Sequence, residues 1–364
     1  MDVAGQVELV FSGGTAHTGN HVNLSAVRTE GEHLWVAGDE TATIERLVLD
    51  SPSAPSRGES ERSFALADFV DLPGPPEEEA DIEGIARSGG WLWAVGSHSV
   101  ARKQIKPHHS DEKAVRRLAK TKRQANRYVI ARLAVEIGAD GRPEPVRVAS
   151  DGRRSALVGG AGSENLADLL IGDEHLAPFL AIPSKDNGLD VEGLAAHGDA
   201  LYVGLRGPVL RGWAVVLEVL PVLDPTDPAR LLLGPWGDGA RYQKHFLNLG
   251  GLGVRDLCPD GDDLLVLAGP SMALSGPVRV YRWRGALTHA TGRVVRGEEI
   301  TLETELPHGD GVDHAEGIAL LEPGDDTGAR LLVVYDSPSL ARRPTPHSVL
   351  ADRVAATPVR SPGL

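Results

Sequence analysis

Short apolar stretches, separated by turns rich in glycine and aspartate, recur along the chain. Five segments align without gaps over their first half: "NLSAVRTEGEHLWVAGDE" from Asn23, "DIEGIARSGGWLWAVGSH" from Asp81, "DVEGLAAHGDALYVGLRG" from Asp190, "GVRDLCPDGDDLLVLAGP" from Gly253 and "HAEGIALLEPGDDTGARLLVVYDS" from His314. Each has the pattern of a strand, a tight turn and a second apolar strand, which is typical of a β-hairpin. Further apolar strands follow and precede the segments. Four-stranded units repeated at roughly sixty residues predict a β-propeller.

The number of blades depends on one long interval between repeats. The aligned positions are Ser25, Glu83, Glu192, Arg255 and Glu316, so the intervals are 58, 109, 63 and 61 residues. Two insertions account for the long interval: a basic helical segment at 101–127 and a second one at 138–175. Five blades then suffice, if "APFLAIP" (177–183) is the outer strand of the second blade and the amino-terminal "QVELVFSG" pairs with the last blade to close the ring. If "VRVASDGRRSALVGG" (146–160) is a degenerate hairpin instead, there are six. We favour five, in a single all-β propeller domain over residues 1–364 with helical insertions in the second blade region.

Composition supports many short elements. The 364 residues include 43 glycines and 25 prolines, which both interrupt regular structure. Only residues 110–126 and 163–171 have a helical pattern, too few for a doubly wound α/β protein, which needs helices between its strands. Cys258 is the single cysteine, which excludes an intramolecular disulfide and a multi-thiolate zinc site. We expect Cys258, Trp35 and Trp93 to be buried in the core.

The chain has the features of a soluble protein. No segment approaches the roughly 18 apolar residues that a membrane span needs. The amino terminus, "MDVAGQVELVFSGG", has no basic patch followed by a long apolar stretch, so it does not match a signal peptide. We therefore expect a cytoplasmic protein with no membrane partner.

Charge is distributed unevenly. The formal net charge is −14, yet residues 101–127 hold ten basic and two acidic side chains, a charge of +8 that leaves −22 for the rest of the chain. Binding to nucleic acid needs a basic face on the body of a protein. The acidic body therefore argues against a nucleic-acid partner, whereas the basic insertion allows a local contact with a small anion.

The acidic residues of the repeat are expected to gather in the central channel. The first strand of each propeller blade lines the axis, and residues two apart in a strand face the same side. The pairs expected to point into the channel at matching heights are Asp81 with Glu83, Asp190 with Glu192, and His314 with Glu316. Asn23, Ser25 and Arg255 occupy the corresponding places in the other two repeats. A glycine follows each of the three glutamates, which indicates a crowded backbone at that position.

Carboxylates that face one another repel, and each has a raised pKa unless a cation offsets the charge. One solution is a hard divalent cation, Ca²⁺ or Mg²⁺, with Glu83, Glu192, Glu316, Asp81 and Asp190 as its ligands. The second is a ring of internal ion pairs with Arg255, Arg206 or Arg211, and the third is a cationic ligand bound directly.

Other candidates lie where the second strands end, around the same opening. His98 and His314 are candidate general bases because a histidine titrates near neutrality. Arg206 and Arg211, in "GLRGPVLRGW", suit contacts with a carboxylate or phosphate. Within the basic insertion, which includes Lys103, "SDEKAVRRLAKTKRQAN" predicts an amphipathic helix capped by Ser110 or Asp111. This helix is either a lid that brings cations over an anionic substrate or a solvated helix on an acidic body.

Three segments resemble a known bacterial family. They are "GSHS" (96–99), "HLAPFLAIPSKDNGLDVEGLA" (175–195) and "GLRGPVLRGW" (204–213), and the family is domain of unknown function 3616. The resemblance covers nearly the whole chain, but the family name implies no activity. More distantly, "DIEGIA", "DVEGLA" and "HAEGIA" are similar to blade starts of esterase-like phytase and gluconolactonase-like propellers. In those proteins a glutamate at this position contributes to a calcium-type site, which implies Glu83, Glu192 and Glu316 as ligands here.

Two functional hypotheses follow. The first is a metal-dependent hydrolase of a small anionic ester, phosphoester or lactone, in which Arg206, Arg255 and the basic insertion orient the substrate. The second is a ligand- or protein-binding propeller whose acidic and arginine ring is structural. GxSxG, P-loop and HExxH patterns are absent from the sequence, which argues against the commonest classes of hydrolase and nucleotide-binding protein that such motifs identify.

Overall fold

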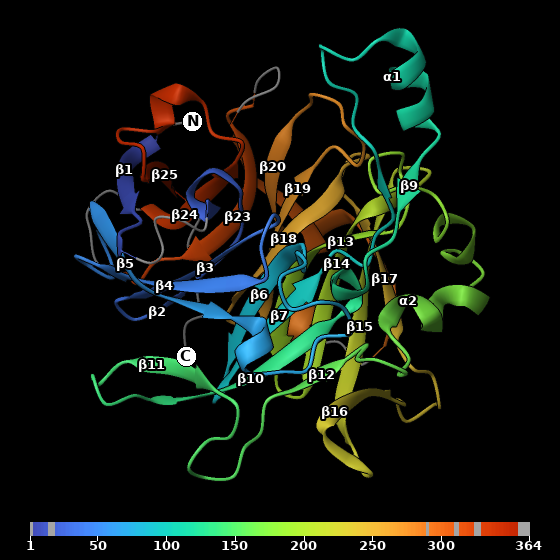
Figure 1. Cartoon of the computed structure of the whole chain (residues 1–364), viewed down its shortest axis with the longest axis horizontal. Helices are drawn as coiled ribbons and strands as arrows, with labels where there is room; N and C mark the ends of the chain where they lie inside the picture. The colour runs from blue at the N-terminus through green and yellow to red at the C-terminus, as the bar shows by residue number, and fades with distance from the viewer. Residues whose placement is uncertain (1–2, 14–18, 289–290, 309–312, 324–328, 356–364) are drawn as a thin grey trace.

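The computed structural model describes residues 3–13, 19–288, 291–308, 313–323 and 329–355, and it is nearly all-β (Figure 1). The turn of the fifth repeat includes residues 324–328, which lie outside the described residues. None of the helices in the described part of the chain is long and apolar enough to span a bilayer.

Antiparallel pairing groups the strands by sequence repeat. The first group is β2 (Leu24–Glu30), β3 (His33–Gly38), β4 (Thr43–Leu49) and β5 (Arg57–Ala65). The second is β6 (Ile82–Ser88), β7 (Trp91–Gly96) and β10 (Ile130–Ile137), with β11 (Pro143–Val146) and β12 (Ala156–Val158) on the free edge of β10. The third is β13 (Asp190–His197), β14 (Ala200–Leu210) and β15 (Trp213–Asp224), with β16 (Asp227–Gly234) and β17 (Gln243–Asn248) both paired to β15.

The remaining strands complete the same pattern. The fourth group is β18 (Gly253–Asp260), β19 (Asp263–Gly269), β20 (Val278–Trp283) and β22 (Ile300–Leu306). The fifth is β23 (His314–Leu320), β24 (Ala329–Asp336), β25 (Ser348–Ala355) and β1 (Val3–Val10). Short strands β21 (Val294–Val295), β8 (Ala101–Arg102) and β9 (Thr121–Lys122) lie outside these groups.

The innermost strands of the groups meet around one axis. β2 contacts β6, β6 contacts β13, β13 contacts β18, β18 contacts β23, and β23 contacts β2 again. Each contact joins one group to the next, so the sheets are arranged radially, as in a β-propeller. Apolar side chains fill the spaces between neighbouring sheets, and Trp35, Trp93 and Cys258 are buried as predicted.

The first and last strands join the two ends of the chain. β1 pairs antiparallel with β25, with Val7 opposite Ala351 and Leu9 opposite Val349. Figure 1 shows blue β1 beside red β25. The predicted pairing of "QVELVFSG" with the last repeat is therefore confirmed, and burial of Val7 and Leu9 stabilises it.

The region after the second repeat corrects one sequence prediction. "APFLAIP" is not a strand: Ala177–Phe179 forms a 3₁₀ turn, and Pro178 and Pro183 each lack the N–H that a ladder requires. The place beside β10 belongs to β12, in which Val158 pairs with Ile130. The segment 146–160 thus covers the edge of β10 and forms no sheet of its own.

The two helices are shorter than their sequence patterns indicated. α1 (Asp111–Leu118) begins at the predicted cap, where Lys113 N donates to Ser110 Oγ at 3.4 Å. It ends before residue 126 because Thr121 and Lys122 pair with Ala101 and Arg102 as β9 and β8. α2 (Leu166–Leu169) has a capping box formed by Asn165 and Asp168. Figure 1 shows α1 standing apart from the sheets at the edge of the molecule.

Candidate functional site

Each innermost strand has a β-bulge at the repeat position. The pairing register shifts by one residue at five equivalent places, and the unpaired residues there are Ser25, Glu83, Glu192, Arg255 and Glu316. A bulge bends its strand and re-aims one side chain. The repeat therefore directs one side chain per inner strand toward the axis, and it does so through bulges rather than through simple alternation.

The glycine after each glutamate is required by close packing. A Cβ on Gly84 would lie 2.7 Å from Leu194 Cβ, and one on Gly317 would lie 2.8 Å from Val334 Cγ2. A side chain would therefore meet the neighbouring inner strand β13 at Gly84 and the paired strand β24 at Gly317, which confirms the crowding that the sequence indicated.

Two arginines neutralise one half of the acidic ring. Arg206 Nη1 lies 2.5 Å from Glu192 Oε1 and 3.5 Å from Asp190 Oδ2. Arg255 forms an ion pair with Glu316 and lies 3.3 Å from Glu192 Oε2. Arg206 lies on β14 and Arg255 on β18, and their side chains are 7% and 11% exposed. This half matches the expected ring of internal ion pairs.

The other half of the ring is a cluster of three carboxyl groups, Asp39, Asp81 and Glu83. Each offers an oxygen within 4.8 Å of the other two. Arg127 Nη1 lies 2.7 Å from Asp81 Oδ2, and Arg127 also pairs with Glu79. No ion pair to Asp39 or Glu83 is found among the described residues, and the buried Asp39 Oδ1 accepts no hydrogen bond from them. Asp39, which directly follows β3, was not among the site residues predicted from the sequence.

The clustered carboxyl groups have raised pKa values. Burial, together with the charges of Asp336 and Glu316, raises the pKa of Asp39 to about 8. Burial and the neighbouring Asp81 raise the pKa of Glu83 well above its usual value. Burial raises the pKa of Asp190 to about 7 and that of Glu316 to about 8, in spite of their arginine partners. Without a cation, the cluster therefore holds protons at neutral pH.

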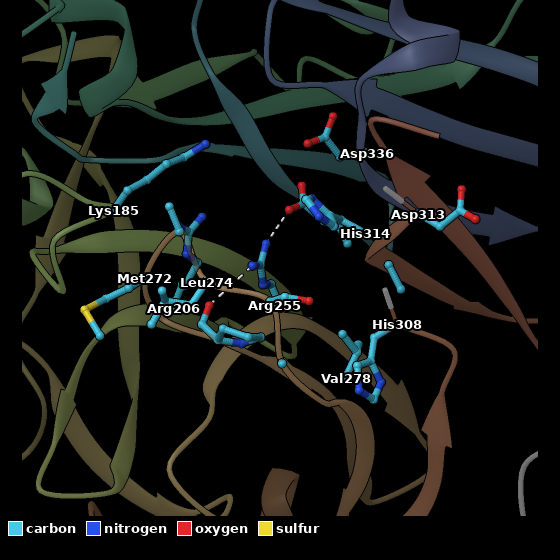
Figure 2. Close-up of a pocket in the computed structure, with 16 residues that line it drawn as sticks. Lys185, Arg206, Arg255, Met272, Leu274, Val278, His308, Asp313, His314 and Asp336 are labelled. Atoms are coloured by element: carbon cyan, nitrogen blue, oxygen red, sulfur yellow. Dashed lines mark hydrogen bonds and ion pairs between the residues drawn. The ribbon is translucent and has the colours of Figure 1, made fainter. Parts of the chain in front are cut away.

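His314 lies at the edge of this ring with Glu316 and Asp336, and offers a ring nitrogen within 4.8 Å of both carboxylates. Burial and the nearby Arg255 lower the pKa of His314, so its imidazole is neutral at pH 7. These residues line a cavity of about 290 Å³ whose wall also includes Lys185, Arg206 and Arg255. Figure 2 shows the Lys185 side chain reaching toward Asp336 and His314 across the opening.

Lys185 was not singled out in the sequence. It precedes β13 in "PSKDNGLD", and its ammonium is close enough to Asp81 and His314 to affect their pKa values. A lysine in a turn carries no sequence signal for a site. Only the folding of this turn over the inner strands brings it to the cavity.

We use the name channel mouth for the charged groups described above. Its carboxyl groups are Asp39, Asp81, Glu83, Asp190, Glu192, Glu316 and Asp336, and its cations are Arg127, Lys185, Arg206 and Arg255. The carboxyl groups thus outnumber the cations, one of which, Arg127, also pairs with Glu79, and this excess favours protonation or a bound cation.

Three predicted site residues lie elsewhere. His98 is 1% exposed and does not line the cavity; its Nδ1 is 2.8 Å from Gly96 O, its ring packs edge-on against Tyr128, and burial lowers its pKa to about 4. Arg211 lies in the turn between β14 and β15 with a φ of 50°. Lys103 lies in the basic insertion, where its backbone N–H donates to Lys120 O at 3.0 Å.

Below the channel mouth the axis is filled by an ion pair that sequence analysis missed. Arg28 Nη2 lies 2.7 Å from Asp256 Oδ1, and Arg28 Nη1 lies 2.9 Å from Asp256 Oδ2. Arg28 also donates to the carbonyl oxygens of Leu194 at 2.7 Å and Ile318 at 2.9 Å, which belong to β13 and β23. Ile318 N in turn donates to Asp256 Oδ2 at 2.9 Å. This axial plug of Arg28 and Asp256 therefore links the inner strands β2, β13, β18 and β23.

Comparisons with known proteins give a family but no activity. The family described as "Protein of unknown function (DUF3616)" matches residues 23–352. No curated protein matches the sequence.

Solved structures that are similar to this chain have low identity to it. Glutaminyl cyclase of Myxococcus xanthus is 11% identical with a TM-score of 0.39, covering 97% of this chain and 98% of that one. Virginiamycin B lyase of Staphylococcus aureus is 10% identical with a TM-score of 0.34, covering 96% and 99%. A protein provisionally assigned as a 6-phosphogluconolactonase, from Bacteroides fragilis, is 12% identical with a TM-score of 0.29, covering 96% and 95%. At these TM-scores the superpositions are too loose to assign a site, and the propeller-type arrangement rests on the strand pairing.

Proposed function

The chain belongs to the DUF3616 family of proteins of unknown function, and we propose that it binds Ca²⁺ or Mg²⁺ at the channel mouth and hydrolyses a small anionic ester, phosphoester or lactone there. One observation carries this proposal. The carboxyl cluster of Asp39, Asp81 and Glu83 adjoins a cavity that is lined by Lys185, Arg206 and Arg255. Groups suited to a cation and groups suited to an anion therefore share one opening.

The donor set fits a hard divalent cation. Ca²⁺ and Mg²⁺ prefer carboxylate oxygens, and Asp39, Asp81 and Glu83 supply three such groups from two neighbouring repeats. The unpartnered Asp39 Oδ1 and the raised pKa values of Asp39 and Glu83 favour a bound cation, which would replace the protons. Of the ligands predicted from sequence, Asp81 and Glu83 remain in this proposal. Asp81 also pairs with Arg127, but it keeps an oxygen within 4.8 Å of Asp39 and Glu83, whereas Asp190, Glu192 and Glu316 are engaged by Arg206 and Arg255 outside this cluster.

The residues of the cavity have separate roles in the proposed reaction. A bound divalent cation would polarise a substrate oxygen and activate water. Lys185 binds the negative charge of the substrate, while Arg206 and Arg255 hold the surrounding carboxylates in place. His314 is neutral at pH 7, so its free imidazole nitrogen accepts a proton from the attacking water. Neither His98, Arg211 nor Lys103 takes part, because none of them lines the cavity.

A second candidate function is binding without catalysis. The ion pairs of Arg255 with Glu192 and Glu316 favour it, since they join the neighbouring inner strands β13, β18 and β23 as a structural ring would. In that case the cavity holds a small anion or contacts a protein partner and no bond is broken. Turnover of an anionic ester separates the two functions.

We also propose that the ring contains five blades. Five inner strands carry the bulge, and β1 supplies the outer strand beside β25. An experimental structure would test this count directly.

The cation is tested first. Protein stripped with a chelator is titrated with Ca²⁺ and with Mg²⁺ by isothermal titration calorimetry, and its thermal unfolding is recorded with and without each ion. We expect one ion to bind and to raise Tm in the wild type but not in Asp39→Asn or Glu83→Gln, because binding to the folded state stabilises it. Glu40→Gln, at an exposed neighbour of the cluster, is the matched control and keeps the response.

Activity is tested on the ion-loaded protein with a panel of small phosphoesters, carboxylic esters and lactones. Turnover that Lys185→Gln and His314→Gln reduce at least tenfold supports the hydrolase. If no ion binds and Tm does not change, the proposed metal site is wrong. Ion binding without turnover of any panel member would leave the binding function.

A further inference from the structure

The cavity at the channel mouth has a charged floor and an apolar wall. Its floor is formed by Arg206, Arg255 and His314, whereas one side is formed by the loop at 270–277, which joins β19 to β20. Two side chains of this loop line the cavity and remain solvent-exposed: Met272 is 41% exposed and Leu274 is 64% exposed. Figure 2 shows both beside Arg206.

The apolar wall is held in place by the same arginines that neutralise the ring. Arg255 Nη2 donates to Pro270 O at 3.3 Å, and Arg206 Nε donates to Ser271 O at 3.3 Å. Met272 forms a β-bridge with Asp186, the residue after Lys185. The loop is therefore tied at its start to the floor and to the turn that carries Lys185, so Met272 and Leu274 stay over the cavity instead of packing into the core.

Lys185 is the cation of the cavity that has no acidic partner. No carboxylate lies within 4.0 Å of its ammonium among the residues described by the structure, whereas Arg206 and Arg255 are both paired. The bridge between Asp186 and Met272 places the turn that carries Lys185 beside the apolar wall.

We infer that the cavity selects a small anion that carries a short apolar group, such as an alkyl or acyl chain; this inference rests on the proposed function and narrows its substrate class. The anionic group binds Lys185, and the apolar group covers Met272 and Leu274. A volume of about 290 Å³ is at the lower end of small-molecule sites, which are roughly 300–1,000 Å³, so the apolar group is short. Methionine is unbranched and flexible and adapts to chains of different shape.

Binding of monoalkyl phosphates to the Ca²⁺- or Mg²⁺-loaded protein tests this inference. The probes are methyl, butyl and hexyl phosphate, and the measurement is the Kd by calorimetry. In the wild type we expect Kd to fall about two- to fourfold for each added methylene, because each one removes apolar surface from water. The double variant Met272→Ser/Leu274→Ser should lose this dependence and keep the Kd for methyl phosphate within about twofold.

Three further variants separate the parts of the site. Lys185→Gln should weaken all three probes by a similar factor and leave the dependence on chain length intact. Leu223→Ser, at a residue 53% exposed on β15 and outside the cavity lining, should change neither. Leu274→Met in place of serine should restore most of the dependence, which shows that the serine variant acts through lost apolar contact.

The outcomes distinguish the inference from the proposed function. Equal Kd values for methyl and hexyl phosphate in the wild type overturn the inference and leave the cation-assisted anion site standing. A dependence on chain length that survives in the double variant also overturns it. If none of the probes binds although the ion does, the anion site itself is wrong, and the inference fails with it.

Discussion

The axial plug and the channel mouth both use charged groups carried by inner strands of the ring, yet their electrostatics differ. In the axial plug, Arg28 and Asp256 are buried and are hydrogen-bonded to each other and to backbone groups of β13 and β23, although Arg28 Nε has no partner among the described residues. Burial opposes the charge on Arg28, but the carboxylate of Asp256 raises the pKa of its guanidinium. At the channel mouth, by contrast, carboxyl groups outnumber cations and take up protons. The ion pair of the axial plug links the inner strands, whereas the carboxyl cluster of the channel mouth is only partly paired and can contact a ligand.

The largest effect is expected at the axial plug. Arg28→Met should lower the free energy of unfolding by about 3–5 kcal/mol, because Asp256 is left buried without its partner. Urea denaturation measures this loss. Arg57→Met is the control: Arg57 pairs with Glu8 at the surface, so its loss should cost no more than about 1 kcal/mol. Equal losses in the two variants would contradict the structural role of the plug.

At the channel mouth, we expect a substitution to increase stability rather than to decrease it. In ion-free protein at pH 8, Asp39→Asn should raise the free energy of unfolding by about 1–3 kcal/mol, because it removes a buried carboxyl group whose ionisation is unfavourable. The same denaturation experiment measures it, with Glu40→Gln as the control. A loss of stability in Asp39→Asn would mean that the carboxyl group of Asp39 is already satisfied.

The pH dependence follows from the same groups. Asp39 and Glu316 have folded pKa values of about 8, above the values near 4 of an unfolded chain, so the folded state binds more protons between those limits. Stability of the ion-free protein should be highest at low pH in this window. It should fall as pH rises toward 8, by about 1.4 kcal/mol per pH unit for each proton released. Saturating Ca²⁺ or Mg²⁺ should flatten the slope; an identical slope with and without the ion would exclude the cluster as its site.

His98 should cause a smaller change of stability with pH, and in the opposite direction. Its folded pKa of about 4 lies below the unfolded value of about 6.5, so the folded state binds fewer protons and stability falls as pH drops through this range. His98→Asn tolerates the φ of 51° and should remove this acid sensitivity. Binding and turnover should be unchanged; a loss of turnover with normal folding would restore His98 as a catalytic residue.

The smallest effects are expected at Arg211 and Lys103. Arg211→Gly relieves a positive φ in a turn, and Lys103→Gln removes an exposed charge of the basic insertion. Neither should change the Kd of any alkyl phosphate by more than about twofold, since neither residue lines the cavity. A larger change for Lys103→Gln would support the lid interpretation of the insertion.

The sequence by itself determined the repeated hairpins, because a period of two in apolar residues and turns rich in glycine are local properties. It also placed Glu83, Glu192, Arg255 and Glu316 at equivalent positions, since a repeat fixes equivalence whatever the detailed geometry. Even the pairing of β1 with β25 was predictable, because an unpaired strand at one end suits an incomplete sheet at the other.

Tertiary structure alone decided how the charges are shared. Arg28 and Asp39 belong to the first repeat, Asp256 to the fourth and Lys185 to the turn before the third, and nothing in their local sequence indicates which side chains they meet. The sequence of segment 177–183 predicts an outer strand, but β12 occupies the place beside β10. Segment 177–183 instead leads into the turn that places Lys185 at the cavity. Which carboxylates meet an arginine and which meet each other depends on bulges and on loops packed across sheets. These arise from contacts distant in sequence, so the division between axial plug and channel mouth is a property of the folded ring.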